Sequence, residues 1–191
     1  MSWTRSVAMV IGLALVALPV GASVKLMNLH EYMGITVDTV HGHITAKQTF
    51  RSDWPEADTF FTKLTIEGRS VRLGGEARSF EVVFMGSHDP ADDFYHSEAP
   101  QPQDVRLGNE VVVFFARQPK LLPEQGGVNY MWAHDAVYRV ERAFGEPVLV
   151  GKGEGFAFGA NTRLGDALTR ISDTHQLILA ERALEAAPAG K

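Results

Sequence analysis

Apolar and polar residues alternate with a period of two along most of the middle of this chain. The alternation recurs in residues 40–47, 59–66 and 136–142, residues 79–85, SFEVVFM, also have the composition of a strand, and the run 110–116, EVVVFFA, is continuously apolar. A period of two places successive side chains on opposite faces of a strand, and a continuous apolar run is typical of a strand covered on both faces. The sequence therefore predicts a mainly β fold of five to six strands, with the 110–116 strand at its centre.

The first alternating segment shows how this sheet could bend into a barrel. One face of it holds Val40, Ile44 and Ala46, and the other holds His41, His43, Thr45 and Lys47. Ile35 and Val37 are in the opposite phase, which predicts a β-bulge near Asp38–Thr39. Bulges and mid-strand glycines such as Gly42 allow strong bending, and closure removes the open edges of a sheet. We therefore predict a small closed antiparallel OB-like barrel.

Helical spacing marks both ends of the predicted barrel. The segment 26–33, LMNLHEYM, predicts a short amphipathic helix that ends at Gly34. Residues 162–187 predict a long helix with Thr162 as its N-cap. The stripe that this helix should bury consists of residues three or four apart: Leu164, Leu168, Ile171, His175 and Ile178.

The segment 105–115, VRLGNEVVVFF, resembles a strand of a loose group of exported bacterial proteins. These proteins are similar to one another in having a small OB-like barrel behind a signal sequence. Residues 41–44 and 65–67 lie where such proteins place their opening strands, and the resemblance covers residues 30–160. It implies the fold and the compartment. It implies no catalytic residue, because most of the group have no assigned function.

The first 24 residues have the layout of an export segment. Arg5 is followed by the apolar run 6–22, SVAMVIGLALVALPVGA, and the next charge is Lys25. This layout is typical of a signal peptide cleaved after Ala22. It also fits a retained anchor, because residues 3–24 would span roughly 33 Å as a helix. We expect a signal peptide or anchor (1–24), a β-barrel domain (25–161) and a C-terminal helix and tail (162–191), with everything after the first segment in the periplasm.

Composition and motif spacing argue against several classes of protein. The chain has no cysteine, which excludes disulfides, thiol catalysis and cysteine-ligated metal centres. Its net charge of −5 argues against binding of nucleic acid through phosphates. Residues 145–152 have the wrong spacing for a P-loop, and Gly34 stands where a zinc protease begun by His30–Glu31 needs its second histidine. We therefore expect no enzymatic activity and no cofactor.

Four residues are candidate metal ligands: His41, His43, Met131 and His134. The two histidines near residue 42 share one face of a strand, where their imidazoles could bind one copper, zinc or nickel ion. Thioether and imidazole groups, as in 131–134, suit Cu(I). A solvated strand face and an aromatic loop account for the same residues without a metal, and we favour that interpretation.

Acidic residues concentrate in 76–110, which holds eight acidic and two basic side chains. Its centre is the loop 88–96, HDPADDFYH, which could be a solvated loop, a calcium site or a docking patch for a basic partner. Aromatic residues are typical anchors of protein interfaces. The predicted docking surface combines this loop with the aromatic residues of 130–134: Asp89, Asp92, Asp93, Phe94, Tyr95, Tyr130 and Trp132.

These features favour a non-catalytic interaction module. We expect an accessory or structural subunit on the periplasmic face of a bacterial membrane protein complex, of which an energy-transducing complex is one example. Its partners would be other protein subunits and, if residues 3–24 are retained, the membrane itself. A periplasmic copper or zinc carrier is the first alternative, and a hydrolase without a recognisable motif is the second.

Overall fold

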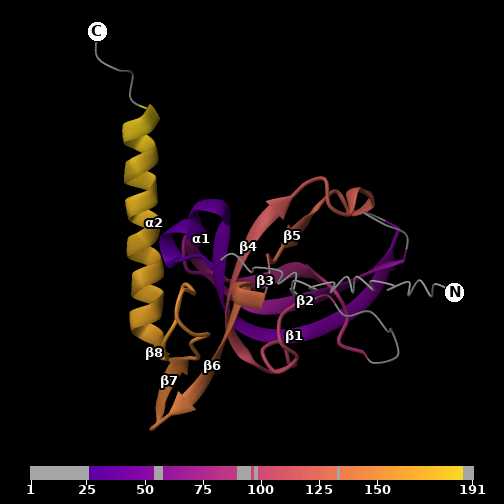
Figure 1. Cartoon of the computed structure of the whole chain (residues 1–191), viewed down its shortest axis with the longest axis horizontal. Coiled ribbons are helices and arrows are strands. Elements are labelled where there is room, and N and C mark those ends of the chain that lie inside the picture. The colour runs from indigo at the N-terminus through magenta and orange to yellow at the C-terminus, as the bar shows by residue number, and fades with distance from the viewer. Residues whose placement is uncertain (1–25, 54–57, 90–95, 97–98, 133, 187–191) are drawn as a thin grey trace, which may run out of the picture.

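The computed structural model describes residues 26–53, 58–89, 96, 99–132 and 134–186, without the side chain of residue 134. Two α-helices, two short 3-10 helices and eight strands lie in these ranges (Figure 1). In chain order they are α1 (Leu29–Ile35), β1 (Asp38–Ser52), β2 (Thr59–Ser70), β3 (Gly74–Met85), β4 (Glu110–Gln118), η2 (Pro123–Gln125), β5 (Val128–Tyr130), η3 (His134–Ala136), β6 (Val137–Ala143), β7 (Glu146–Leu149), β8 (Thr162–Arg163) and α2 (Leu164–Ala186). The predicted mainly β fold with a short first helix and a long last helix is confirmed.

Five strands close into a barrel in the order β1-β2-β3-β5-β4, and β4 pairs back with β1. Four of the five junctions are antiparallel, but β3 and β5 are parallel, through the single pair Val83 and Tyr130. The predicted closed, mainly antiparallel barrel is confirmed, but one of its junctions is parallel. The reason is geometric, because an odd number of strands in a ring cannot alternate direction at every junction. One parallel pair is the minimum that five strands require.

β4 is the central strand, as predicted. It pairs with β1, β5 and β6, and Val111–Ala116 are all buried. On one face, Val113 lies opposite Val40 in the barrel interior. On the other face, Phe114 packs edge-on against Tyr32 of α1, with ring centroids 5.4 Å apart. Two covered faces explain why this strand is continuously apolar in sequence.

The β-bulge of β1 lies at Thr45, so the bulge predicted near Asp38–Thr39 is wrong in position. Pairing with β2 runs in step up to Ile44 and resumes at Ala46, which leaves Thr45 as the extra residue. Beyond the bulge the phase reverses, and Lys47 lies opposite the interior Leu64 rather than on the face of His41. Ala46 is correspondingly exposed. A bulge shifts every following side chain to the other face, since the period of a strand is two.

α1 begins at Leu29, three residues later than predicted, because Asn28 forms a capping box with Glu31. The helix runs through Gly34 to Ile35 rather than ending at Gly34. Its buried residues are Leu29, Tyr32 and Met33.

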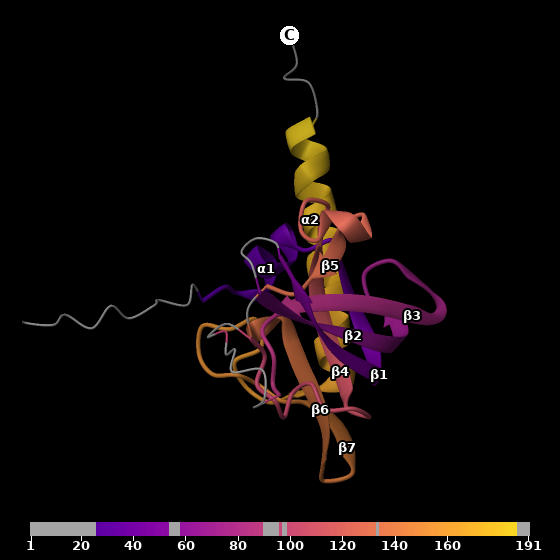
Figure 2. The ribbon, with the colours of Figure 1, turned by 90° about the vertical axis from the view of Figure 1, so that its right-hand side faces the viewer.

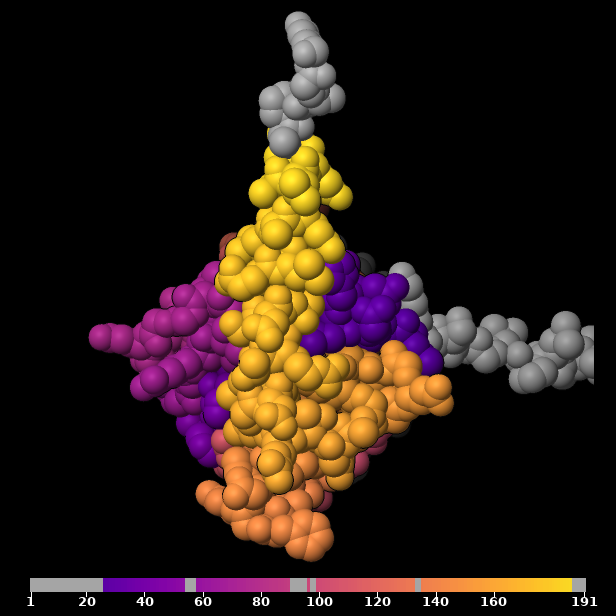
Figure 3. Space-filling model, turned by 90° about the vertical axis from the view of Figure 1, so that its left-hand side faces the viewer, coloured from indigo at the N-terminus to yellow at the C-terminus, as the bar shows by residue number. Residues whose placement is uncertain are grey.

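α2 packs against α1 and the strands β7 and β8 through the predicted stripe. Leu164, Ile171, His175 and Ile178 are buried together with Ala167. Thr162 belongs to β8 and donates its hydroxyl to the carbonyl of Ala160, so it is not the N-cap that the sequence predicted. Figure 3 shows α2 lying across the body of the domain, with its last turns beyond it.

A buried polar cluster positions α2. Arg72 of the β2–β3 turn donates to the carbonyl of Thr36 over 2.7 Å and lies 3.3–3.4 Å from Nδ1 of His175. Burial and the Arg72 charge both lower the pKa of His175. The helix is thus held by a neutral histidine beside a guanidinium.

β6 continues from the barrel into a hairpin with β7, and β8 adds a third strand to it. Figure 2 shows this hairpin extending away from the barrel. None of the helices in the described part of the chain is long and apolar enough to cross a membrane. The apolar run 6–22 lies outside the described residues.

Candidate functional site: a groove at the seam between β3 and β5

The junction between β3 and β5 is the least paired part of the barrel. The backbone N–H of Met131 donates to the carbonyl of Val83 over 2.9 Å. Two residues earlier on β3, the carbonyl of Glu81 accepts from the side-chain amide of Asn129 over 3.0 Å, so a side chain replaces a strand there. β3 and β5 have no other paired residues in the described part of the chain, which leaves a seam between them.

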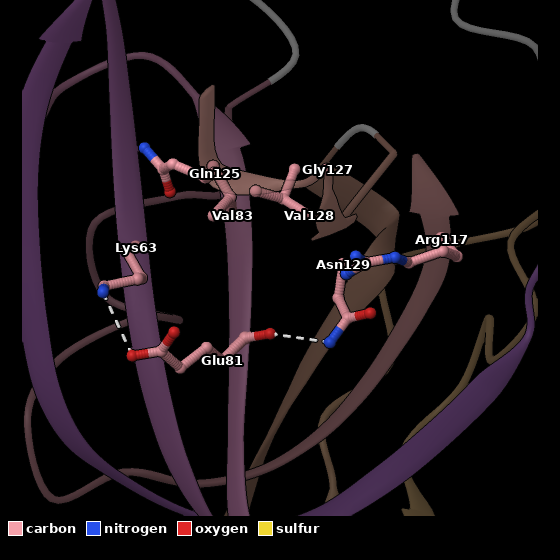
Figure 4. Close-up of a pocket in the computed structure, with 8 residues that line it drawn as sticks. All are labelled: Lys63, Glu81, Val83, Arg117, Gln125, Gly127, Val128 and Asn129. Atoms are coloured by element: carbon pink, nitrogen blue, oxygen red, sulfur yellow. Dashed lines mark hydrogen bonds and ion pairs between the residues drawn. The ribbon is translucent and has the colours of Figure 1, made fainter. Parts of the chain in front are cut away.

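A groove of about 120 Å³ lies at this seam. Figure 4 shows the residues that line it, which come from β2, β3, β4, β5 and the β4–β5 connection: Lys63, Glu81, Val83, Arg117, Gln125, Gly127, Val128 and Asn129. Lys63 forms an ion pair with Glu81 at 3.0 Å. The walls therefore carry charges of both signs and two amides, while Val83 and Val128 supply apolar surface.

The β4–β5 connection that bounds the groove is held in a fixed shape. Gly126 and Gly127 both have positive φ, and a side chain on Gly127 would lie 2.5 Å from the backbone of Pro119. Arg117 donates to the carbonyl of Gly126 over 2.8 Å. Glycine is needed at position 127 because no other residue combines this conformation with so close an approach.

β3 offers an open backbone edge beside the groove. The carbonyls of Val83 and Glu81 point toward β5, so Ser79 directs its N–H and C=O groups to the same side. Gly74, Arg78 and Ser79 pair with β2 alone in the described part of the chain, and residues 74–79 are exposed. An open edge of this kind can pair with an added strand.

Tyr130 and Trp132, both predicted site residues, lie at the end of the seam. Their rings meet edge-on with centroids 5.2 Å apart, and Trp132 is 41% exposed. The hydroxyl of Tyr32 donates to the carbonyl of Trp132 over 2.6 Å, which fixes the backbone. Burial first, and then the charge of Asp135, raise the pKa of Tyr32, so this donor stays protonated.

The acidic loop contributes little that the structure describes. Asp92, Asp93, Phe94 and Tyr95 lie outside the described residues. Asp89 is exposed and lines a separate depression with Lys47, Thr49, His88 and Leu107. Three other acids of the 76–110 segment are paired within the domain: Glu81 with Lys63, Glu110 with His41, and Asp104 with Arg139 and Lys152.

In that depression, the bulge at Thr45 turns Lys47 toward His88. Lys47 Nζ lies 3.0 Å from His88 Nδ1, and His88 Nε2 lies 2.8 Å from the carbonyl of Pro100. The carbonyl requires a proton on Nε2, so Nδ1 accepts from the ammonium. Burial lowers the pKa of both side chains, and the Lys47 charge lowers that of His88 further.

Among the candidate metal ligands whose side chains the structure describes, the two histidines of β1 lie apart from Met131. His41 Nε2 pairs with Glu110 Oε1 at 2.8 Å, and His43 is exposed beside it on β1. Met131 is buried in the main core, and the side chain of His134 lies outside the described residues. The described residues contain no group of three or more histidine, cysteine or acidic side chains that could hold a metal ion.

No family model, no curated protein and no solved structure matches this chain. The geometry of the groove is therefore the basis for assigning a function to it. Sequence reasoning singled out Tyr130 and Trp132 as candidates, which stays a prediction, and it did not indicate the groove. Its charged residues, Lys63, Glu81 and Arg117, are spread over three strands, and only the barrel closure brings them together.

Proposed function

We propose that this chain is a non-catalytic interaction module that binds a partner protein at the seam between β3 and β5. The observation that carries this proposal is the position of an aromatic pair, half-buried Tyr130 and exposed Trp132, at the end of an open strand edge and its groove. An extended segment of the partner would pair with Ser79, place side chains in the groove and cover Trp132.

The strand order supports an OB-like barrel as the finer description of the fold. In that fold, ligands bind over the second and third strands and the adjoining loops, including the one between the fourth and fifth strands. The seam groove lies over the same elements, with Lys63 on β2, Glu81 on β3 and Gln125 in the β4–β5 connection.

The resemblance in 105–115 and the apolar segment 6–22 support a periplasmic location, as an accessory subunit of a membrane complex.

The test is recovery of the partner from native membranes. Full-length tagged chain is purified in mild detergent as wild type and as Ser79→Pro, Trp132→Ala and Leu107→Ala. Proline at position 79 removes the backbone N–H that faces the open edge. It removes no hydrogen bond to β2, because the backbone N–H of Ser79 is directed away from β2. Leu107 is an exposed apolar control in the other depression.

We expect Ser79→Pro and Trp132→Ala to lose the co-purifying protein and Leu107→Ala to keep it. Truncation of an aromatic anchor weakens binding by about 2 kcal/mol or more. Retention of the same protein by both seam variants, with all four chains equally folded, would show that the seam is not the binding surface.

A further inference from the structure

Phe144, at the tip of the β6–β7 hairpin, is fully exposed (107%). Every other phenylalanine in the described ranges is buried or half-buried. The hairpin extends away from the barrel (Figures 1 and 2). A free aromatic ring exposes on the order of 150–250 Å² of largely apolar surface.

The backbone at Phe144 adds a second unfavourable feature. Ala143 pairs with Glu146, so Phe144 and Gly145 form a two-residue turn, and their φ angles are 53° and 87°. Positive φ angles at both central residues are characteristic of a type I′ turn, whose first central position favours asparagine, aspartate or glycine. A bulky residue in the left-handed region is strained. Packing within the domain compensates for neither feature.

Beside Phe144 lies an open depression of about 300 Å³. It is lined by residues of β6, β7 and the β8 region: Ala143, Phe144, Glu146, Val148, Asn161 and Arg163. The hairpin therefore presents an exposed aromatic side chain at the edge of an open depression that the same side chain helps to line.

Charge on this surface is self-complementary. Val148 lies opposite Arg163, and Glu146 is two residues from Val148 on the same face of the small sheet. Glu146 and Arg163 are exposed, and neither forms an ion pair with any residue that the structure describes. A two-fold axis brings residue i of one copy to residue j of the other and j to i. It can thus form two Glu146–Arg163 pairs at once.

We propose that a second copy of this chain binds at the β6–β7–β8 surface, with Phe144 of each copy inserted in the depression of the other. Reciprocal insertion covers both rings and places opposite charges at the rim. This contact is separate from the seam groove and does not rest on the function proposed for it. Two phenylalanines bury less area than a permanent dimer requires, so the dimer is concentration-dependent.

The test is sedimentation of the full-length chain in mild detergent over a range of concentrations. Wild type should show a monomer–dimer equilibrium, and Phe144→Asn should raise its dissociation constant at least about tenfold. Asparagine tolerates the left-handed turn, so this variant keeps its fold, which thermal unfolding checks. Leu107→Asn, at another exposed apolar site, should leave the equilibrium unchanged.

Charge reversal provides a second arm. Glu146→Arg alone and Arg163→Glu alone should each weaken self-association, whereas an equimolar mixture of the two variants should form a heterodimer. A monomer at every concentration would overturn the proposal. So would a dimer that Phe144→Asn leaves unchanged, or a mixture that shows no preference for the heterodimer.

Discussion

Replacing Gly42 with alanine should open the barrel at the crossing of β1 and β2. Gly42 lies directly opposite Gly68, and a Cβ on Gly42 would stand 2.3 Å from the carbonyl oxygen of Glu67 and 2.6 Å from Cα of Gly68. A non-bonded contact to carbon requires about 3.5 Å, so the strands would have to separate by roughly 1 Å. Both obstructing atoms belong to the backbone, and no rotamer change relieves the overlap.

Separation by this amount breaks ladder hydrogen bonds beside the pair and loosens the packing of the interior. Overpacking costs about 1–3 kcal/mol, and each lost hydrogen bond adds about 0.5–1.5 kcal/mol. We expect Gly42→Ala to lower the free energy of unfolding by about 2–4 kcal/mol, which for a chain of this size lowers Tm by roughly 5–15 °C.

The matched control is Gly34→Ala. Gly34 lies in α1, its φ is not positive and nothing lies within 4 Å of an added Cβ. Alanine there should raise stability by about 0.5–1 kcal/mol, because glycine is unfavourable within a helix. Urea denaturation measures the free energy of unfolding of both variants and of the wild type. Equal midpoints for Gly42→Ala and wild type would refute the close crossing and, with it, this geometry of barrel closure.

Three further outcomes follow from the core and from the α2 contact. Leu64→Ala should cost about 2–5 kcal/mol by denaturation, because Leu64 is wholly buried in the barrel, whereas exposed Leu107→Ala should stay within about 0.5 kcal/mol of wild type. Arg72→Met should speed amide exchange in α2 and leave β4 protected, since the guanidinium joins Thr36 to the helix; uniform exchange would contradict this. Burial and Arg72 lower the pKa of His175, so the folded state binds fewer protons than the unfolded state. Stability should be full above about pH 6.5 and fall as pH drops toward 5, and equal urea midpoints at pH 7.5 and 5 would contradict the sign.

The sequence predicts the fold correctly where a pattern of apolar residues is compatible with only one structural arrangement. A continuous apolar strand must be covered on both faces, and β4 is. The stripe from Leu164 to Ile178 has helical spacing, and α2 buries it. The bulge was misplaced because Ile44-Thr45-Ala46-Lys47 reads as a regular alternation. Alanine fits either face, so the reversal of phase at Thr45 leaves no mark in the sequence.

The candidate site divides in the same way. Tyr130 and Trp132 could be chosen as candidates from the sequence because aromatic residues in a predicted loop are conspicuous by type alone. Lys63, Arg117 and Asn129 could not, because ordinary polar residues on separate strands become a groove only where the pairing of β3 with β5 ends. The parallel pair itself was open to prediction, since any closed ring of five strands contains one.

Site-specific photocrosslinking in intact cells tests the central proposal most directly. A photoreactive phenylalanine analogue is placed at position 132, at position 79 on the open edge of β3, or at position 107 as the control. Partner binding at the seam predicts one discrete adduct, common to positions 132 and 79 and absent at position 107. Equal labelling at all three positions, or no adduct at either seam position, would contradict the account.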